Sequence, residues 1–272
     1  MEMKANFHSH TQFCDGRSSM EEIVRAAMDA GYSIWGFTPH APLCLPSPCN
    51  MPSESVKAYK EEIERLRKLF PQIKILAGME VDFLNERHGP ASEEVKSYDL
   101  DYIIGSVHFI PNQRGEYYDI DGSPERFKET LNKYFDGDVH YVVRTYWTQV
   151  QNMIKEGGFD IIGHIDKIAL NASYAEPGIE ATEEYRRLAE ETMEMAVESG
   201  KEIEINTKHW KKYGRFFPHP RFWNFLIERG VKMPVDSDTH YAEKIEDGRL
   251  EAMQILSDIK GGNYSAYNGI MI

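Results

Sequence analysis

Histidine and carboxylate side chains follow several short apolar runs of this sequence, an arrangement typical of metal-binding sites. His8 and His10 come at the end of the first run, and because alternate residues of a strand point the same way, both imidazoles can bind one ion. Later runs are followed by other side chains that bind metals, namely His40, Glu80, His108, His164, Asp238 and His240. With Asp15, in the loop after His10, the sequence offers nine candidate ligands.

The types of these donors indicate which chemistry they support. Imidazole and carboxylate groups together suit zinc, iron and manganese, and nine donors exceed the needs of one tetrahedral ion. We therefore predict two or three divalent ions with at least one bridging carboxylate. Such sites bind the attacking and the leaving oxygen of a phosphoryl group, and they lower the pKa of a bound water.

Each candidate ligand also has a simpler interpretation. A histidine at a strand end is more often a hydrogen-bonded structural residue, Asp15 could belong to a turn, and Glu80 or Asp238 could cap a helix. Repetition at successive strand ends favours the metal site. Four other histidines lie outside the pattern and are expected at the surface, with His209 as the one exception that its loop allows; they are His88, His140, His209 and His219.

Alternation of short apolar runs with amphipathic stretches indicates the elements that position these ligands. The runs predict strands at residues 4–8, 33–38, 73–79, 101–107, 159–164, 201–206 and 231–236. Helices are predicted between them, at residues 19–30, 54–69, 124–135, 139–156, 181–199, 219–229 and 246–259. This order is typical of a parallel sheet closed into a barrel, whose active site lies at the carboxyl ends of the strands. We predict a single domain over residues 1–272.

Composition and charge exclude several classes of protein. Hydrophobic residues make up 41% and charged residues 28%, which suits a globular protein with a buried core, and no apolar run is long enough for a membrane span. A net charge of -13 argues against nucleic-acid or anionic-membrane partners. No signal peptide is evident, and three cysteines without CxxC spacing favour the reducing cytoplasm. A small anionic substrate held by metals remains compatible with this composition.

The motifs that contain the candidate ligands resemble those of the PHP (polymerase and histidinol phosphatase) superfamily, and most closely its histidinol-phosphate phosphatase branch. The resemblance covers essentially the whole chain. It rests on His8-Ser9-His10-Thr11, Cys14-Asp15-Gly16, Phe37-Thr38-Pro39-His40-Ala41-Pro42, Gly78-Met79-Glu80, Gly105-Ser106-Val107-His108-Phe109, Gly163-His164-Ile165-Asp166, Glu204-Ile205-Asn206-Thr207 and Asp236-Ser237-Asp238-Thr239-His240. The stretches around His40 and His108 resemble the phosphatase branch in particular.

This resemblance implies an α/β fold, a distorted seven-stranded (β/α)7 barrel of the TIM type, with three divalent ions that would be zinc, iron or manganese. The first ion would be held by His8, His10, Glu80 and Asp238. Glu80 would bridge to a second ion on His108 and His164, and the third would be held by Asp15, His40 and His240.

The resemblance also implies a reaction, the hydrolysis of L-histidinol phosphate to L-histidinol and phosphate in histidine biosynthesis, by a hydroxide that bridges the ions. Asp238 and His240 are the candidates for the catalytic acid. Basic side chains expected at the substrate are Lys167, Lys211 and Arg215, with Lys212 as a further candidate. The family often has Gly and Arg where this chain has Lys208-His209-Trp210-Lys211, a departure that bears on substrate identity.

Three other functions are compatible with the same residues. The chain could hydrolyse another small ester such as a nucleotide or sugar phosphate, although its acidity opposes a nuclease. It could be a non-catalytic metal-binding PHP domain, which the complete set of ligands opposes. It could be an amidohydrolase, but that class usually has a bridging lysine where this chain has Glu80.

Overall fold

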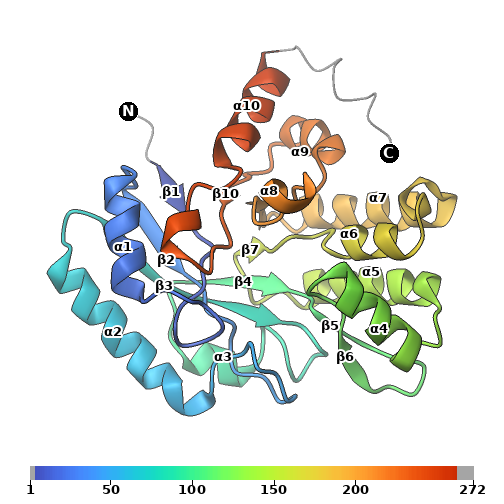
Figure 1. Cartoon of the computed structure of the whole chain (residues 1–272), viewed down its shortest axis with the longest axis horizontal. Coiled ribbons are helices and arrows are strands. Elements are labelled where there is room, and N and C mark those ends of the chain that lie inside the picture. The colour runs from blue at the N-terminus through green and yellow to red at the C-terminus, as the bar shows by residue number, and fades with distance from the viewer. Residues whose placement is uncertain (1–3, 262–272) are drawn as a thin grey trace.

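A parallel β-sheet forms the centre of the fold, and helices cover its outer side (Figure 1). The computed structural model describes residues 4–261. Six strands pair in the order β1-β2-β3-β4-β7-β8, and every pairing is parallel, so their carboxyl ends meet on one side. The sheet curls like half a barrel. The bounds of its strands are Ala5–Asn6 (β1), Ile34–Phe37 (β2), Lys74–Asp82 (β3), Tyr102–Ser106 (β4), Ile161–Ile162 (β7) and Glu202–Ile203 (β8).

A second parallel pair continues from the last strand of this sheet. It consists of β9 (Ile205–Asn206) and β10 (Val235–Asp236). Only Glu204 separates β8 from β9, and successive amides of residues 202–205 donate alternately toward β7 and toward β10, so this extended segment lies between the two strands. Beyond β10, the amide of His10 donates to the carbonyl of Thr239 over 2.8 Å. The residues that follow the first and the last strand are therefore neighbours.

The helices lie on the outer side of the sheet, with α1 and α2 beside β1–β3 and α4–α7 at the other end (Figure 1). Their bounds are Met20–Asp29 (α1), Val56–Leu69 (α2), Glu93–Ser97 (α3), Pro124–Tyr134 (α4), Val139–Glu156 (α5), Ile168–Ala175 (α6), Glu183–Glu198 (α7), Trp210–Tyr213 (α8), Trp223–Glu228 (α9) and Arg249–Lys260 (α10). Helix α1 begins with a capping box formed by Ser19 and Glu22. Among residues 4–261, no helix combines the length and the apolarity that crossing a membrane requires.

Apolar side chains fill both sides of the curled sheet. On the inner side, Tyr102, Ile104 and Ile161 form a small buried cluster with Phe7 and Leu76 packed against it. On the outer side, one large cluster lies under α4–α7 and another under α1 and α2. Because apolar residues occupy the interior of the curl, the polar ligands are left at one end of it.

Every predicted strand range overlaps an observed strand, and every predicted helix range overlaps an observed helix. Strand β3 is longer than predicted, because it pairs with β4 as far as Asp82 and therefore includes Glu80. The antiparallel hairpin of β5 (Phe109–Pro111) and β6 (Tyr117–Asp119) was not predicted, nor were the short helices α3, α6 and α8. These pieces are too short to give a clear hydrophobic period.

Two adjacent glycines before β7 give a first testable prediction. Both have positive φ, +68° at Gly157 and +82° at Gly158, but a Cβ on Gly158 would lie 2.4 Å from the Cα of Ala91, whereas one on Gly157 meets nothing within 4 Å. We expect Gly157→Ala to lower the free energy of unfolding by about 2 kcal/mol from backbone strain alone, because its φ of 68° and ψ of -144° lie in a region that essentially only glycine adopts. Gly158→Ala should cost about 3 kcal/mol or more, because a clash adds to the strain. Urea unfolding of both variants measures the difference, and equal losses would contradict the predicted clash.

Candidate metal centre

The structure brings all nine predicted ligands to the carboxyl ends of the strands. His8 and His10 follow β1, His40 follows β2, His108 follows β4, His164 follows β7, and Asp238 and His240 follow β10, while Glu80 lies within β3 and Asp15 in the loop before α1. Donor atoms within 4.8 Å of one another form three groups that could each hold an ion. The groups are His8, His10 and Asp238; His40, Glu80 and His108; and His10, Asp15, His40 and His240.

The first group is fully buried and centres on one carboxylate oxygen. The Nε2 atoms of His8 and His10 lie 3.8 and 3.0 Å from Oδ1 of Asp238. The same two nitrogens lie 3.3 and 3.5 Å from Oε2 of Glu80. Four side chains from three strand ends thus direct their donors at one point, as the resemblance implied.

The other oxygen of Glu80 faces a different pair of imidazoles. Oε1 lies 2.8 Å from Nε2 of His164 and 3.6 Å from Nε2 of His108. The two imidazole nitrogens are 3.2 Å apart. One carboxylate therefore lies between two sets of histidines, which is the geometry of a bridging ligand.

The remaining group lies nearer to solvent. Oδ2 of Asp15 is 3.2 Å from Nε2 of His240, and its Oδ1 is 4.0 Å from Nε2 of His40. His10 also borders this group, since its ring centroid lies 4.0 Å from that of His240. His40 is closer to Glu80, with Nδ1 at 3.1 Å from Oε2, so Glu80 contacts all three groups.

The spacing and the unpaired atoms of these side chains fit a cluster of divalent ions. Ligands of one tetrahedral ion with bonds of about 2.1 Å lie about 3.4 Å from one another, and the donor separations described above range from 2.8 to 4.0 Å. Several buried donor atoms have no hydrogen-bond partner among the described residues, and burial without a partner is unfavourable. They include Nε2 of His8, Nε2 of His10, Oδ1 of Asp15, Nδ1 of His40 and Oε2 of Glu80.

The electrostatics of the site keep both central carboxylates ionised. Burial alone would raise the pKa of Glu80, but the imidazoles of His8 and His40 bring it well below its usual value. Burial would likewise raise the pKa of Asp238, and the Lys208 ammonium together with His8 lowers it well below the usual range. Both carboxylates are therefore available as metal ligands at neutral pH.

The two histidines after β1 differ in their preferred charge. Burial lowers the pKa of His10, and the neighbouring His240 and His40 lower it further, so its imidazole is neutral. Burial also lowers the pKa of His8, but nearby carboxylates, Glu204 foremost, more than offset this and raise it. A metal ion at His8 must therefore displace a proton from that ring.

Carboxylates outside the nine ligands fix the orientation of two of the imidazoles. Oε2 of Glu204 lies 2.7 Å from Nδ1 of His8, and Oδ1 of Asp82 lies 3.0 Å from Nδ1 of His108. In both rings Nε2 then faces the cluster. Metal-binding histidines usually have such a partner on the other ring nitrogen, which sets the tautomer.

Asp238 has a backbone conformation that few residues other than glycine adopt, with φ of +46°. Its side chain is held by two hydrogen bonds, from the Asn206 amide and the Lys208 ammonium, both at 3.0 Å. Strained conformations persist where the surroundings fix them, and they concentrate at functional sites.

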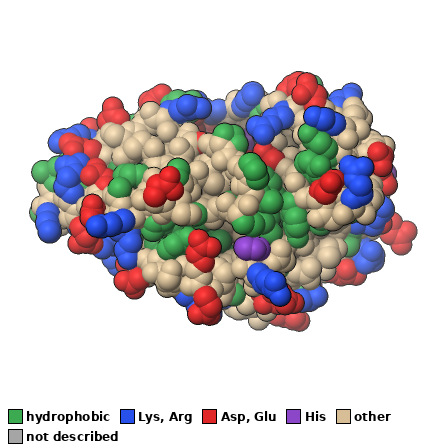
Figure 2. All heavy atoms as spheres, turned by 90° about the horizontal axis from the view of Figure 1, so that it is seen from below, with side chains coloured by type: hydrophobic (Ala, Val, Ile, Leu, Met, Phe, Trp, Pro, Cys, Tyr) green, Lys and Arg blue, Asp and Glu red, His purple; other side chains and the backbone are tan. Residues whose placement is uncertain are grey.

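A cavity of about 390 Å³ opens over the third group of ligands. Its wall includes Asp15, His40, His108 and His240 from the cluster, and Ser47, Cys49 and Asn50 from the loop between β2 and α2. The other residues that line it are Asp82, Phe109, Asp119, Asp121, Gly122, Ser123, Arg126, Lys208, His209, Lys212 and Tyr213. From below, a histidine side chain reaches the surface near the middle of the face, with acidic and basic side chains nearby (Figure 2).

The three predicted substrate-binding side chains lie in different places. Lys167 is buried, and its Nζ is 3.4 Å from Oδ2 of Asp121 in the cavity wall. Lys211 is exposed and pairs with Asp247 at 2.5 Å, and it does not line the cavity. Arg215 also lies outside the wall, and its guanidinium contacts Glu180 at 2.7 Å.

Lys208 is the basic residue of this loop that sequence reasoning missed. Its ammonium lies 3.0 Å from Oδ1 of Asp238 and 3.4 Å from Nε2 of His240, and the side chain lines the cavity. Burial lowers its pKa, but Asp238, Asp121 and Asp15 more than compensate, so the ammonium keeps its charge. Its position directly after the Asn206-Thr207 motif at a strand end was the available signal.

The remaining histidines largely follow the prediction. His88 is exposed, and His140 and His219 are half-buried and apart from the ligand groups. His209 lines the cavity, as its loop allowed, although it belongs to none of the three groups.

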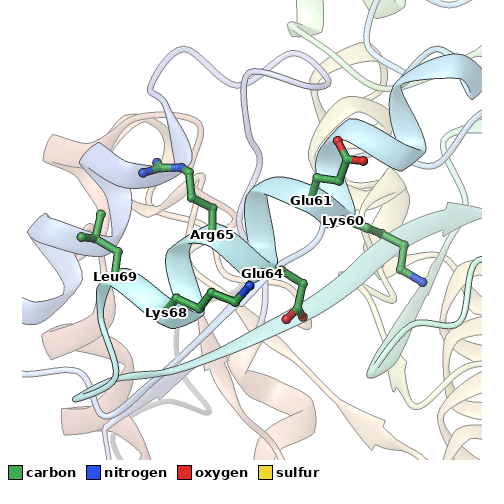
Figure 3. Close-up of a pocket in the computed structure, with 6 residues that line it drawn as sticks. All are labelled: Lys60, Glu61, Glu64, Arg65, Lys68 and Leu69. Atoms are coloured by element: carbon green, nitrogen blue, oxygen red, sulfur yellow. The ribbon is translucent and has the colours of Figure 1, made fainter.

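A shallow depression on the outer side of α2 has none of the features of an active site. Lys60, Glu61, Glu64, Arg65, Lys68 and Leu69 line it. Their side chains spread along one helix and do not converge on a common point (Figure 3). We therefore take the histidine-rich cavity as the candidate site.

Comparison with known proteins identifies the family to which the chain belongs. The model of the PHP domain matches residues 6–208, which is well over half of the chain. A probable histidinol-phosphatase of Deinococcus radiodurans is 26% identical over 260 residues, which cover 93% of each protein.

Two solved structures have a similar fold. A candidate histidinol phosphatase from Listeria monocytogenes superposes with a TM-score of 0.80 at 21% identity, over 91% of this chain and 99% of that one. Histidinol phosphate phosphatase from Lactococcus lactis, solved with zinc, L-histidinol and phosphate, gives 0.68 at 20% identity, over 94% of this chain and 93% of that one. On the strength of the matching domain model, the chain belongs to the PHP domain family.

Proposed function

We propose that this protein is a metal-dependent phosphomonoesterase that hydrolyses L-histidinol phosphate to L-histidinol and phosphate. The observation that carries the proposal is the convergence of nine donor residues at one cavity, eight of them in the three groups and the ninth, His164, in contact with Glu80. The probable histidinol-phosphatase of Deinococcus radiodurans and the Lactococcus lactis enzyme support the choice of substrate.

We propose three divalent ions, with zinc, iron and manganese as the candidates. His8, His10, Glu80 and Asp238 would hold the first, Glu80, His108 and His164 the second, and Asp15, His40 and His240 the third. Divalent ions at such a site supply Lewis acidity and make hydroxide available near neutral pH.

Two basic side chains support recognition of a phosphate, Lys208 in the cavity wall and Lys167 behind it, on the wall residue Asp121. Lys208 carries its ammonium next to the ligands, and Lys167 carries a buried ammonium beside the Asp121 carboxylate. An ammonium of this kind attracts equatorial phosphate oxygens and offsets the charge that develops during hydrolysis. Lys208 and Lys167 are therefore our candidates for phosphate binding.

The acidic part of the wall suits the amine of histidinol. Asp119 and Asp121 line the cavity, as does Arg126, which follows them closely in the sequence. Burial and the neighbouring Asp121 raise the pKa of Asp119, so a ligand ammonium beside this carboxylate would favour its ionised form. A substrate with a phosphate and an ammonium group thus meets a partner for each.

His240 is the better placed of the two predicted acids. It lines the cavity, whereas Asp238 is fully buried beneath it and stays ionised. We propose that a water beside His240 protonates the leaving alkoxide, because His240 would hold an ion through one ring nitrogen and donates to the carbonyl of Asp238 through the other.

A substrate panel tests the proposed function. The metal-loaded protein should hydrolyse L-histidinol phosphate with a kcat/KM at least ten times that for nucleoside monophosphates and sugar phosphates. A preference for another ester would retain a phosphatase and replace the substrate. No hydrolysis of any ester by metal-loaded protein would favour a non-catalytic metal-binding domain.

Removing the Lys208 ammonium should weaken substrate binding, because Lys208 is a cation in the cavity wall. We expect Lys208→Ala to raise KM for the phosphate ester about tenfold, the loss of about 1.4 kcal/mol that one charged contact supplies. Lys211→Ala, which breaks the pair with Asp247, should change KM much less, and Lys57→Ala on exposed α2 is the neutral control. A larger effect at Lys211 than at Lys208 would reverse our assignment.

Three broader proposals follow from the same observations. The hydrogen bond between the residues beyond β1 and β10 supports closure of the seven strand positions into a distorted (β/α)7 barrel. We further propose one domain over residues 1–272. Three free cysteines, Cys14, Cys44 and Cys49, support a cytoplasmic location.

A further inference from the structure

We propose that Glu204 is a positioning residue that holds ligands of two different metal groups at once, His8 through its ring and His164 through its backbone. This inference rests on the proposed metal centre. Its new content is a role for a carboxylate that is not among the nine ligands.

Each oxygen of Glu204 accepts hydrogen bonds from a different part of the site. Oε2 contacts Nδ1 of His8 at 2.7 Å. Oε1 accepts from the backbone amide of His164 at 2.6 Å and from the side-chain amide of Asn206 at 3.0 Å. Glu204, His8 and Asn206 have no exposed surface, and His164 has almost none.

Glu204 lies toward the carboxyl end of a central strand. Its amide donates to the carbonyl of Ile162 in β7, and the next amide, of Ile205, donates to the carbonyl of Pro234 before β10. The amides of Glu202 and Ile203 bind Asp160 and Lys232 in the same alternation, so the segment has β7 on one side and β10 on the other. Glu204 is completely buried, whereas Glu202, two residues earlier on the same segment, is half-buried and pairs with Lys232 at the surface.

The hydrogen bonds require two acceptor oxygens. The backbone amide of His164 and the amide nitrogen of Asn206 can only donate, so Oε1 must accept. If Oε2 also accepts, Nδ1 of His8 carries the proton and Nε2 presents its lone pair to Glu80 and Asp238. A carboxylate meets both demands.

A glutamine at position 204 would supply only one of the two acceptor oxygens that these hydrogen bonds require. Its carbonyl oxygen would remain with the two obligate donors, and its NH₂ group would face Nδ1 of His8. That contact favours the other tautomer, with the proton on Nε2, where it blocks coordination. Glu204→Gln therefore removes a metal ligand without touching any of the nine.

Asp82 offers a matched comparison, because it binds His108 with a single oxygen. Oδ1 accepts from the backbone amide of His108 at 2.8 Å and from its Nδ1 at 3.0 Å. The carbonyl oxygen of an asparagine can occupy the same place and keep the tautomer. Asp82→Asn removes a negative charge from the site, as Glu204→Gln does, but it leaves the acceptor in place.

The experiment measures metal content and affinity in four proteins: the wild type, Glu204→Gln, Asp82→Asn and the surface control Glu202→Gln. Zinc bound after dialysis is counted by mass spectrometry, and affinity is measured by competition with a chelating dye. We expect zinc affinity to fall about 10- to 100-fold in Glu204→Gln, by clearly less in Asp82→Asn and not at all in Glu202→Gln.

The outcomes separate this inference from the proposed function. A wild type that binds no metal would overturn the proposed metal centre. Normal affinity in Glu204→Gln would overturn the role of Glu204 alone, and an equal loss in Asp82→Asn would show that charge matters and the number of acceptors does not. If Glu204→Gln fails to fold, ¹⁵N NMR of histidine-labelled, zinc-loaded wild type decides: a protonated Nδ1 on His8 is expected, and its absence refutes the inference.

Discussion

Replacing Glu80 by alanine is expected to lower kcat/KM for the phosphate ester at least about a thousandfold, which corresponds to about 4 kcal/mol of transition-state stabilisation. Glu80 is fully buried, and its two oxygens face different histidines, His8 and His10 on one side and His108 and His164 on the other. Its loss removes the bridge and leaves the imidazoles without a counter-charge. Bound metal should fall together with activity.

Two variants control for general effects of substitution near the site. His88→Ala and Glu86→Ala change exposed residues in the loop after β3, which contribute no donor to the three ligand groups. Both should retain full metal content and activity. Near-normal turnover in Glu80→Ala, with its metal retained, would show that the bridging role is wrong.

Chelation should abolish activity and also destabilise the fold. The donors come from strand ends throughout the sheet, so ions bound to them stabilise only the folded protein. For one site with free metal at one hundred times Kd, binding raises the free energy of unfolding by about 2.7 kcal/mol. In a protein of this size that is a rise of about 5–10 °C in Tm.

The measurement compares protein dialysed against a chelator with the same sample after metal is restored. Activity and Tm should return together, and zinc, iron and manganese added separately would identify the most effective ion. Full activity in chelator-treated protein that has been shown to contain no metal would refute a metal-dependent mechanism. An unchanged Tm would show that the donors do not bind ions tightly.

The positions of the donors were predictable because a parallel sheet brings all its carboxyl strand ends to one side. His8 and Asp238, far apart in sequence, thus become neighbours without any knowledge of the loops. The type of each residue and its place after an apolar run were sufficient. The same rule gives the order of the helices and strands, since each amphipathic stretch must bury one face against the sheet.

The parts that the sequence did not reveal depend on local turns. In the loop after β9, hydropathy cannot show which lysine faces the site: α8 directs Lys211 to Asp247, while Lys208 remains beside Asp238. Alternation places Glu202 and Glu204 on one face of the strand, but Glu202 lies nearer its amino end, where it pairs with Lys232, and Glu204 lies nearer its carboxyl end, beside His8. Hydropathy does not show which of the two glutamates reaches the ligands.

The cluster joins residues from the earliest and the latest strands, and this has a consequence for how the protein is made. His8 and His10 leave the ribosome near the start of synthesis, but Asp238 and His240, which complete two of the three donor groups, are added only after β10. A growing chain has a partial set of donors until that point. Loading of these two groups with metal is therefore a late step of biogenesis, and messages truncated before codon 238 yield a product that cannot assemble the complete centre.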